Sequence, residues 1–300
     1  MPSEPVILLT GKDGQVGTAL LPVLHHLGRI VAVGRRECDL ADATAIANIV
    51  RATRPNIIVN AAAYTAVDKA EGDMALAFAV NARAPGLLAQ LASESGATLI
   101  HYSTDYVFDG NKTQPYREDD PTCPLSVYGQ SKLAGEIAIL AANPQCLVLR
   151  TSWVFSEHGT NFLKTMLKLA CERDALAIVS DQFGAPTSAN LIARVTERVV
   201  RSIAHDKDAT PYGIYHLAAQ GETSWHGFAV YLIERARALG LPVRVAVDAI
   251  KPIPTSAYPT AAARPLNSRL NTAKLRSNFD FDLPPWQDGV QSVLEALAQP

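Results

Sequence analysis

Short, continuous apolar runs alternate with longer amphipathic segments through the first half of the chain. The apolar runs lie at residues 6–10, 30–33, 57–59, 99–102 and 147–149. Runs of this kind are typical of parallel strands that are buried on both faces. The segments between them have helical periodicity, at about residues 15–27, 43–53, 74–95 and 128–141. This alternation predicts an α/β fold with a doubly wound parallel sheet, of the Rossmann type, that binds ligands beyond the carboxyl ends of its strands.

The pattern is less regular after Trp153. Helices are predicted at about residues 161–173, 189–205, 224–239 and 285–298, with short strands at 177–179, 215–217 and 243–245. Residues 252–270 are rich in Pro, Ser, Thr and Ala, and we expect an ordered loop with a binding role there. We therefore expect a nucleotide-binding Rossmann domain in residues 1–153, to which the chain returns at about 176–180 and 212–240. Residues 154–300 would form most of a second, smaller α/β domain for the substrate.

Composition and charge narrow the classes of function. The chain has 300 residues, of which 48% are apolar, and a net charge of −2. It has no cluster of Lys and Arg and no apolar run of about 18 residues, so we expect neither a nucleic-acid nor a membrane partner. No basic segment precedes the first apolar run, which favours a strand over a signal peptide. The four cysteines are widely spaced, which indicates reduced thiols and a cytoplasmic protein.

A glycine turn follows the first predicted strand. Gly11, Gly14 and Gly17 have the spacing GxxGxxG between a strand and a helix. In a dinucleotide site the first glycine permits a tight turn, the second lets a pyrophosphate approach backbone N–H groups, and the third allows close packing of helix on strand. The alternative is a glycine-rich turn with no ligand. The strand-to-helix context favours the dinucleotide site.

The residues after the second predicted strand bear on which nicotinamide cofactor is used. Many NAD sites have an acidic residue here, which binds the ribose hydroxyls, but this chain has Gly34-Arg35-Arg36. Arg35 can bind a 2′-phosphate through two N–H groups, so NADPH is favoured and NADH stays possible. The alternative is that both arginines are simply solvated. Asp39 and Leu40 follow and could lie against the adenine.

Tyr128 and Lys132 lie four residues apart, so a helix places them on one face, one turn apart. A phenol has an ordinary pKa of roughly 10, and a nearby ammonium lowers that pKa toward the working range. Such a pair suits proton delivery to a carbonyl oxygen while a hydride reaches the carbon. Thr104, at a predicted strand end, offers a second hydroxyl. Chance spacing of Tyr and Lys, and a threonine that bonds only to backbone, are the alternatives.

Several longer segments narrow the assignment. They are residues 60–71 (NAAAYTAVDKAE), 101–108 (HYSTDYVF), 127–136 (VYGQSKLAGE), 150–155 (RTSWVF), 181–187 (DQFGAPT) and 254–269, which ends in RPLNSR. With these segments the chain resembles the extended short-chain dehydrogenases/reductases and, within them, the dTDP-4-dehydrorhamnose reductase family. The resemblance implies NADPH-dependent reduction of the C4 keto group of dTDP-4-dehydro-β-L-rhamnose to dTDP-L-rhamnose, the last step of dTDP-rhamnose synthesis.

The resemblance also implies roles for individual residues. Tyr128 would donate the proton to the keto oxygen, Lys132 would hold the nicotinamide ribose and lower the tyrosine pKa, and Thr104 would assist. The cofactor would be lined by Gly14, Gln15, Val16, Asp39, Leu40, Ala62, Ala63, Thr65 and Tyr102. The substrate would be bound by Asp105 and Trp153 at the sugar and by Arg264, Asn267 and Arg269 at the nucleotide end.

The chain departs from part of the family at one feature. Some members bind magnesium through glutamates at a dimer contact, but the corresponding positions here are Ala19, Asn190 and Gln287. We therefore expect no metal and a monomer or weak homodimer. Two other functions stay open: a related nucleotide-sugar reductase or epimerase, and a non-catalytic regulatory subunit that binds NADP.

Overall fold

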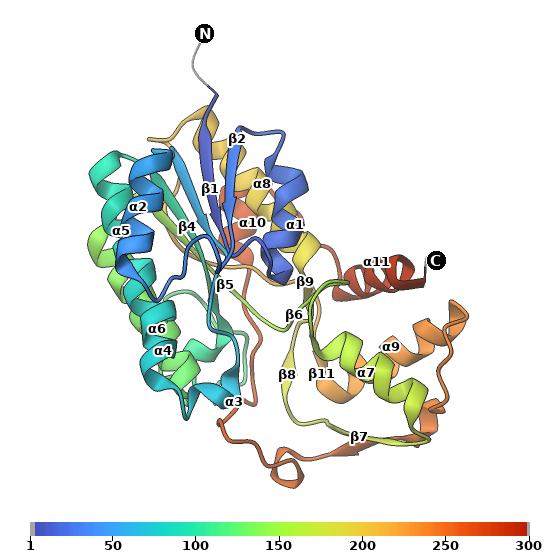
Figure 1. Cartoon of the computed structure of the whole chain (residues 1–300). Coiled ribbons are helices and arrows are strands. Elements are labelled where there is room, and N and C mark those ends of the chain that lie inside the picture. Colours follow the sequence, from blue (N-terminus) through green and yellow to red (C-terminus); the bar gives the residue numbers. More distant parts are fainter. Residues whose placement is uncertain (1–3, 299–300) are drawn as a thin grey trace.

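A six-stranded parallel sheet forms the centre of the computed structural model, which describes residues 4–298 (Figure 1). The strand order is β10-β5-β4-β3-β1-β2. The strands are β1 (Val6–Thr10), β2 (Arg29–Val33), β3 (Ile57–Asn60), β4 (Thr98–Thr104), β5 (Cys146–Thr151) and β10 (Gly213–His216). This topology confirms the predicted α/β fold class. Strand β2 pairs with one side of β1, and the chain then crosses to the other side, where β3 and the later strands are added in order.

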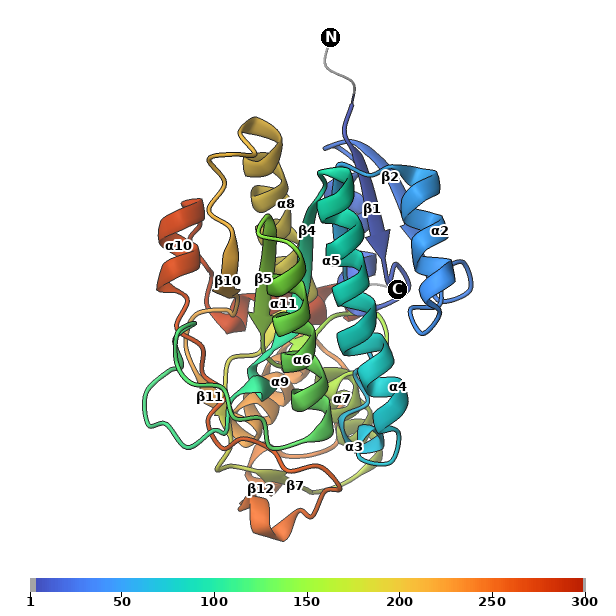
Figure 2. The ribbon, with the colours of Figure 1, turned by 90° about the vertical axis from the view of Figure 1, so that its left-hand side faces the viewer.

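Helices cover both faces of the sheet (Figures 1 and 2). On one face lie α1 (Gln15–Leu24), α8 (Ala189–His205) and the short α10 (Ala273–Phe279), and on the other lie α2 (Ala43–Thr53), α5 (Ala84–Ser95) and α6 (Val127–Ala142). Side chains alternate along each strand: Leu9 belongs to the apolar cluster under α1 and α8, and Leu8 to the cluster under α2 and α5. This burial on both faces explains the continuous apolar strands.

The helix predicted over residues 74–95 contains a change of geometry. It starts as α4 (Met74–Phe78), widens into a π-helical turn at Ala79–Arg83 and continues as α5; a separate short helix, α3 (Val67–Ala70), precedes it. Pro85 lies just after this turn and has no N–H to donate to the preceding turn, which accounts for the altered hydrogen bonding. The π-helical turn positions Asn81, which contacts the candidate site.

A smaller layer lies below the carboxyl ends of the main strands in Figure 1. It contains three two-stranded pairs: β6 (Val154–Phe155) with β9 (Thr187–Ser188), β7 (Leu176–Val179) with β12 (Ile250–Ile253), and β8 (Phe183–Gly184) with β11 (Thr223–Ser224). Three helices belong to it: α7 (Phe162–Glu172), α9 (Trp225–Ala238) and α11 (Trp286–Ala298). Within residues 4–298, no helix has the length and apolar character needed to cross a membrane.

The structure corrects parts of the predicted division into domains. Residues 176–179 do not return to the main sheet but pair with β12, and of segment 212–240 only β10 joins that sheet, since α9 packs on α7 and β7. Helices α8 and α10 lie beyond residue 154 yet pack around the main sheet. Residues 243–245 form no strand, and β12 begins just before the segment predicted to be a loop and ends inside it. Short apolar runs carry no information on their partner strand. Residues 1–3 and 299–300 of the predicted domains lie outside the described residues.

Candidate active site

A cleft of about 710 Å³ opens between the carboxyl ends of the main strands and the smaller layer. Most of the predicted site residues line it: Gly11, Gly14, Gln15, Val16, Arg35, Asp39, Leu40, Ala62, Ala63, Thr65, Tyr102, Thr104, Asp105, Tyr128, Lys132, Trp153 and Arg264. Gly17, Asn267 and Arg269 do not line it. Segments that are far apart in the sequence therefore meet at one opening, as expected for a ligand site at the end of a parallel sheet.

The glycine turn shows very close backbone contacts at its ends and an ordinary contact at its middle, where a Cβ on Gly14 would lie 3.4 Å from Gly11 O. Gly11 has φ +76°, and a Cβ there would lie 2.6 Å from the backbone nitrogen of Ala62. A Cβ on Gly17 would lie 2.0 Å from the carbonyl oxygen of Gly11, so Gly17 serves packing of helix on turn. Gly14 is the N-cap of α1 and caps it with no side chain. The first amides of α1 thus face the cleft, which fits the pyrophosphate of a dinucleotide.

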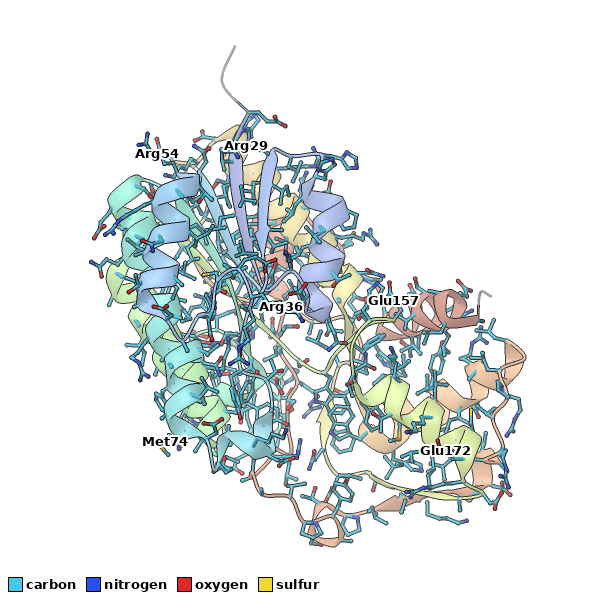
Figure 3. All side chains as sticks on the ribbon, in the orientation of Figure 1. Arg29, Arg36, Arg54, Met74, Glu157 and Glu172 are labelled. Atoms are coloured by element: carbon cyan, nitrogen blue, oxygen red, sulfur yellow. The ribbon has the colours of Figure 1, made fainter. Side chains whose placement is uncertain are left out.

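At the end of β2, Arg35 and Asp39 line the cleft and approach each other, with Arg35 Nε 3.6 Å from Asp39 Oδ2. Figure 3 shows Arg36 near the carboxyl ends of the strands, whereas Arg29 and Arg54 lie toward the amino ends. Glu37 is an acid that the sequence reasoning did not consider. It accepts a hydrogen bond from Gly34 N at 2.8 Å and from Lys12 Nζ at 2.6 Å. These bonds fold Glu37 back onto the turn, and Arg35 stays 75% exposed.

The segment after β3 passes close to the glycine turn and is held by Asn81. The side-chain oxygen of Asn81 accepts from Tyr64 N at 2.8 Å, and the side-chain nitrogen donates to Tyr64 O and to Ser131 Oγ, both at 3.0 Å. This fully buried amide fixes the backbone that presents Ala62, Ala63 and Thr65 to the cleft. Sequence reasoning missed Asn81, because nothing in its local sequence indicates a contact 17 residues away.

Helix α6 brings the Tyr128–Lys132 pair to the cleft. Ser126 caps the helix, its hydroxyl accepting from Gly129 N at 3.2 Å, and so places Tyr128 in the first turn. Thr104 reaches the same region from the end of β4. Lys132 is only 1% exposed. Its Nζ donates to the carbonyl oxygen of Tyr102 at 2.6 Å and lies 3.2 Å from His101 Nε2.

The electrostatics of this pair differ from the expectation. Burial raises the pKa of Tyr128 well above its ordinary value, and Thr104 opposes this shift only in part. Burial also lowers the pKa of Lys132 to about 8, which Glu136 opposes. The expected lowering of the tyrosine pKa by Lys132 is therefore wrong for this structure, since desolvation disfavours the charged forms of both groups. A raised pKa keeps the phenol protonated, which is the state that a proton donor needs before reduction.

A buried carboxyl group faces the cleft beside this pair. Asp105 is 2% exposed, and its Oδ1 accepts from Thr104 Oγ1 at 3.0 Å. Its Oδ2 has no hydrogen-bond partner among residues 4–298. Burial raises the pKa of Asp105 to about 6, although the nearby hydroxyls of Ser268 and Thr104 favour the carboxylate and oppose this. A buried oxygen without a partner costs free energy, so this position fits a ligand that brings a hydroxyl donor.

Two stacked tryptophans form the opposite wall. Trp153 has the left-handed φ of 49°, and its ring stacks on Trp225 with 3.6 Å between centroids. Gly184 leaves room for this ring, since a Cβ there would lie 2.7 Å from Trp153 Cε2. Trp225 Nε1 donates to Gln182 Oε1 at 3.1 Å. Sequence reasoning identified Trp153 but missed Trp225, 72 positions later, because only folding brings the rings together.

The residues expected at the nucleotide end of the substrate separate into two groups. Arg264 lines the cleft, and its guanidinium pairs with Asp68 at 2.6 Å. Asn267 instead donates to the backbone oxygens of residues 112 and 114, at 2.6 and 3.0 Å. Arg269 pairs with Glu222 at 2.8 Å. In this structure Asn267 and Arg269 thus connect neighbouring loops outside the cleft, and their contact with the nucleotide stays a prediction.

Comparison with known proteins agrees with this geometry. Residues 5–299 match the family model described as RmlD substrate binding domain. The chain belongs to this family. It is 48% identical over 286 residues to a dTDP-4-dehydrorhamnose reductase of Burkholderia thailandensis, covering 95% of this chain and 96% of the relative. It is also 48% identical over 295 residues to one of Escherichia coli, covering 97% of each.

A solved structure of a relative contains NADP. The dTDP-4-dehydrorhamnose reductase of Bacillus anthracis, in complex with NADP, is 31% identical to this RmlD-family chain with a TM-score of 0.88, covering 98% of this chain and 99% of that one. The match extends over both the main sheet and the smaller layer. The resemblance inferred from the sequence segments is therefore confirmed at the level of the family.

Proposed function

We propose that this protein reduces the C4 keto group of dTDP-4-dehydro-β-L-rhamnose to dTDP-L-rhamnose with NADPH. The observation that carries the proposal is the convergence of Tyr128, Lys132 and Thr104 on the cleft that is also lined by the glycine turn. Membership of the RmlD family and the naming of its relatives support the same reaction. NADH is the second cofactor that we consider.

Different residues of the cleft bind the cofactor and donate the proton. The turn at Gly14 and the start of α1 hold the pyrophosphate, and Arg35 holds the 2′-phosphate. Bound NADPH supplies the hydride that reaches the keto carbon. Tyr128 donates its phenolic proton to the oxygen on which negative charge develops, and Thr104 hydrogen-bonds to that oxygen or to the phenol. Lys132, anchored on the Tyr102 carbonyl, holds the nicotinamide ribose.

The remaining lining residues recognise the substrate. Asp105 receives a hydroxyl of the sugar on its unpartnered oxygen, and Trp153 packs against the apolar side of the ring. Arg264 provides a positive charge for the diphosphate. When the substrate binds, the guanidinium leaves its ion pair with Asp68 and pairs with the diphosphate. We propose that the main sheet with its helices binds the nucleotide cofactor and that the smaller layer holds the sugar nucleotide. We also propose that the protein acts in the cytoplasm as a monomer or weak homodimer, without nucleic-acid or membrane partners.

The test is a turnover assay with the purified full chain. NADPH and NADH are compared side by side with dTDP-4-dehydro-β-L-rhamnose as substrate, and nicotinamide absorbance is followed. The proposal predicts stoichiometric consumption of NADPH and formation of dTDP-L-rhamnose. An epimerase would interconvert sugars without net consumption, and a regulatory subunit would bind NADP without turnover. Either result would overturn the proposed reaction.

A further inference from the structure

A row of buried polar side chains crosses the sheet beneath the catalytic pair. Thr10, Asn60 and His101 lie at matching register positions on the neighbouring strands β1, β3 and β4. Thr10 Oγ1 donates to Asn60 Oδ1 at 2.6 Å, and Asn60 Nδ2 lies 3.0 Å from His101 Nδ1. Each side chain is at most 1% exposed. Buried polar groups are costly unless they are paired, so three of them that bond to one another across three strands indicate a role.

The row ends at the catalytic lysine. His101 Nε2 lies 3.2 Å from Lys132 Nζ. An ammonium has three N–H groups, and the carbonyl of Tyr102 receives one of them at 2.6 Å. Glu136, the nearest carboxylate along α6, is occupied by Arg150 at 2.7 Å and by Ser103. His101 is therefore the side chain that can take a second N–H of Lys132 and leave the third for the cleft.

The hydrogen bonds of the row couple the imidazole to the charge of Lys132. An uncharged imidazole donates at one nitrogen and accepts at the other. With Asn60 oriented as in the structure, Nδ1 accepts and Nε2 carries the proton, which suits an uncharged Lys132 amine. With the Asn60 amide turned by half a rotation, its oxygen accepts from Nδ1–H, and Nε2 accepts from the Lys132 ammonium. Thr10 can donate or accept, so it satisfies either arrangement.

We propose that His101 is a positioning residue for the reduction: in the NADP-bound enzyme its Nε2 accepts from the Lys132 ammonium, its Nδ1–H donates to the oxygen of the turned Asn60 amide, and Thr10 accommodates that turn. The inference rests on the proposed function for the role of Lys132. Burial and the charge of Lys132 hold the pKa of His101 well below its ordinary value, so the ring stays uncharged and keeps an acceptor. Two anchors on the lysine then aim its remaining N–H at the ribose.

The kinetic test uses two substitutions of different chemistry. His101→Leu removes the acceptor, whereas His101→Gln retains a side-chain oxygen near the position of Nε2. Without the hydrogen bond to His101, the Lys132 ammonium is less well aligned. Because hydrogen bonds to charged groups are strong, we expect kcat of His101→Leu to fall by about 10- to 100-fold. His101→Gln recovers most of that loss, while KM for the sugar nucleotide changes little in both. Equal kcat for His101→Leu and wild type, or equal loss in both variants at unchanged Tm, overturns the proposal.

A spectroscopic test does not depend on turnover or on the folding of His101→Leu. The chain has 7 histidines, and ¹⁵N-imidazole NMR of the full protein bound to NADP⁺ distinguishes their tautomers. The signal missing from His101→Gln identifies His101. A proton on Nδ1 supports the proposal, and a proton on Nε2 or a charged ring overturns it. Because no sugar is present, this outcome is separate from failure of the proposed reaction, which the turnover assay reveals by itself.

Discussion

Gly17 packs against the carbonyl oxygen of Gly11 so closely that a Cβ on Gly17 would lie 2.0 Å from that oxygen. The contact joins the start of α1 to the turn after β1, and the same turn approaches the backbone of Ala62. A small relaxation could not relieve the clash of such a Cβ, because the atoms around it belong to the backbone of the turn. The geometry of the cofactor turn therefore depends on this glycine pair, although Gly17 itself does not line the cleft.

Gly17→Ala is expected to destabilise the protein by about 1–3 kcal/mol or more, the usual cost of overpacking, and to abolish NADPH binding. Gly14→Ala is the matched control, since a Cβ there would meet its nearest atom, Gly11 O, at an ordinary 3.4 Å. We expect it to keep a wild-type Tm but to weaken NADPH binding, because Gly14 lines the cleft. Thermal unfolding and NADPH fluorescence titration check both. Equal Tm for the two variants would contradict the packing role.

Tyr128→Phe removes the proposed proton donor and leaves the ring in place. We expect kcat to fall by about 10²- to 10⁴-fold, the usual contribution of an acid catalyst, with little change in NADPH affinity. Phe at this position keeps the edge contact of the ring with Tyr106, which has 5.6 Å between centroids. Steady-state kinetics and NADPH titration are the measurements. Retention of more than about a tenth of kcat would exclude Tyr128 as the donor.

Arg35→Ala is expected to weaken NADPH binding by about tenfold and to leave NADH binding nearly unchanged, because only NADPH has a 2′-phosphate to pair with the guanidinium. Arg36→Ala is the control: Arg36 does not line the cleft, and its loss should affect both cofactors little. The ratio of kcat/KM for the two cofactors checks this. An unchanged ratio in Arg35→Ala would show that the arginine is only solvated.

The buried Asp105 predicts a pH dependence of stability. Its folded pKa is about 6, above the ordinary value of 3.8, so the folded state holds the proton more tightly than the unfolded state. Its favourable contribution is present below about pH 4 and is lost as pH rises through about 6, a change of about 3 kcal/mol. Asp105→Asn lacks this titration. Between about pH 4 and 7 its free energy of unfolding should rise relative to wild type by up to that amount, as measured by urea unfolding. Parallel pH curves would contradict this.

Glu136→Gln leaves Arg150 buried without its charge partner. The two side chains lie 2.7 Å apart and are 2% and 3% exposed, so we expect a destabilisation of about 3–5 kcal/mol. Glu197→Gln is the control, because its partner Arg201 lies at the same 2.7 Å but is 53% exposed. That variant should lose no more than about 1 kcal/mol. Urea unfolding of the two variants decides between them, and similar losses would refute the role of burial.

The sequence alone determined those features whose physical cause is local. Continuous apolar runs predicted the strands, because burial on both faces removes alternation. The Tyr128–Lys132 spacing follows from the pitch of one helix, and the glycine spacing reflects backbone contacts within a single turn. These patterns, with the family segments, were enough to predict the fold class, the presence of Tyr128 and Lys132 in the cleft and most of the other residues that line it.

Only the tertiary structure decided which distant segments meet. The pairing of β7 with β12, the brace from Asn81 and the stack of Trp225 on Trp153 depend on packing between elements, and local sequence does not specify a partner. Burial likewise decided the direction of the pKa shifts: it lowers the pKa of Lys132 and raises that of Tyr128, whereas the helix spacing predicted a lowered pKa for the tyrosine. The row that joins Thr10 to Lys132 exists because three strands stand in register, and that register is a property of the folded sheet.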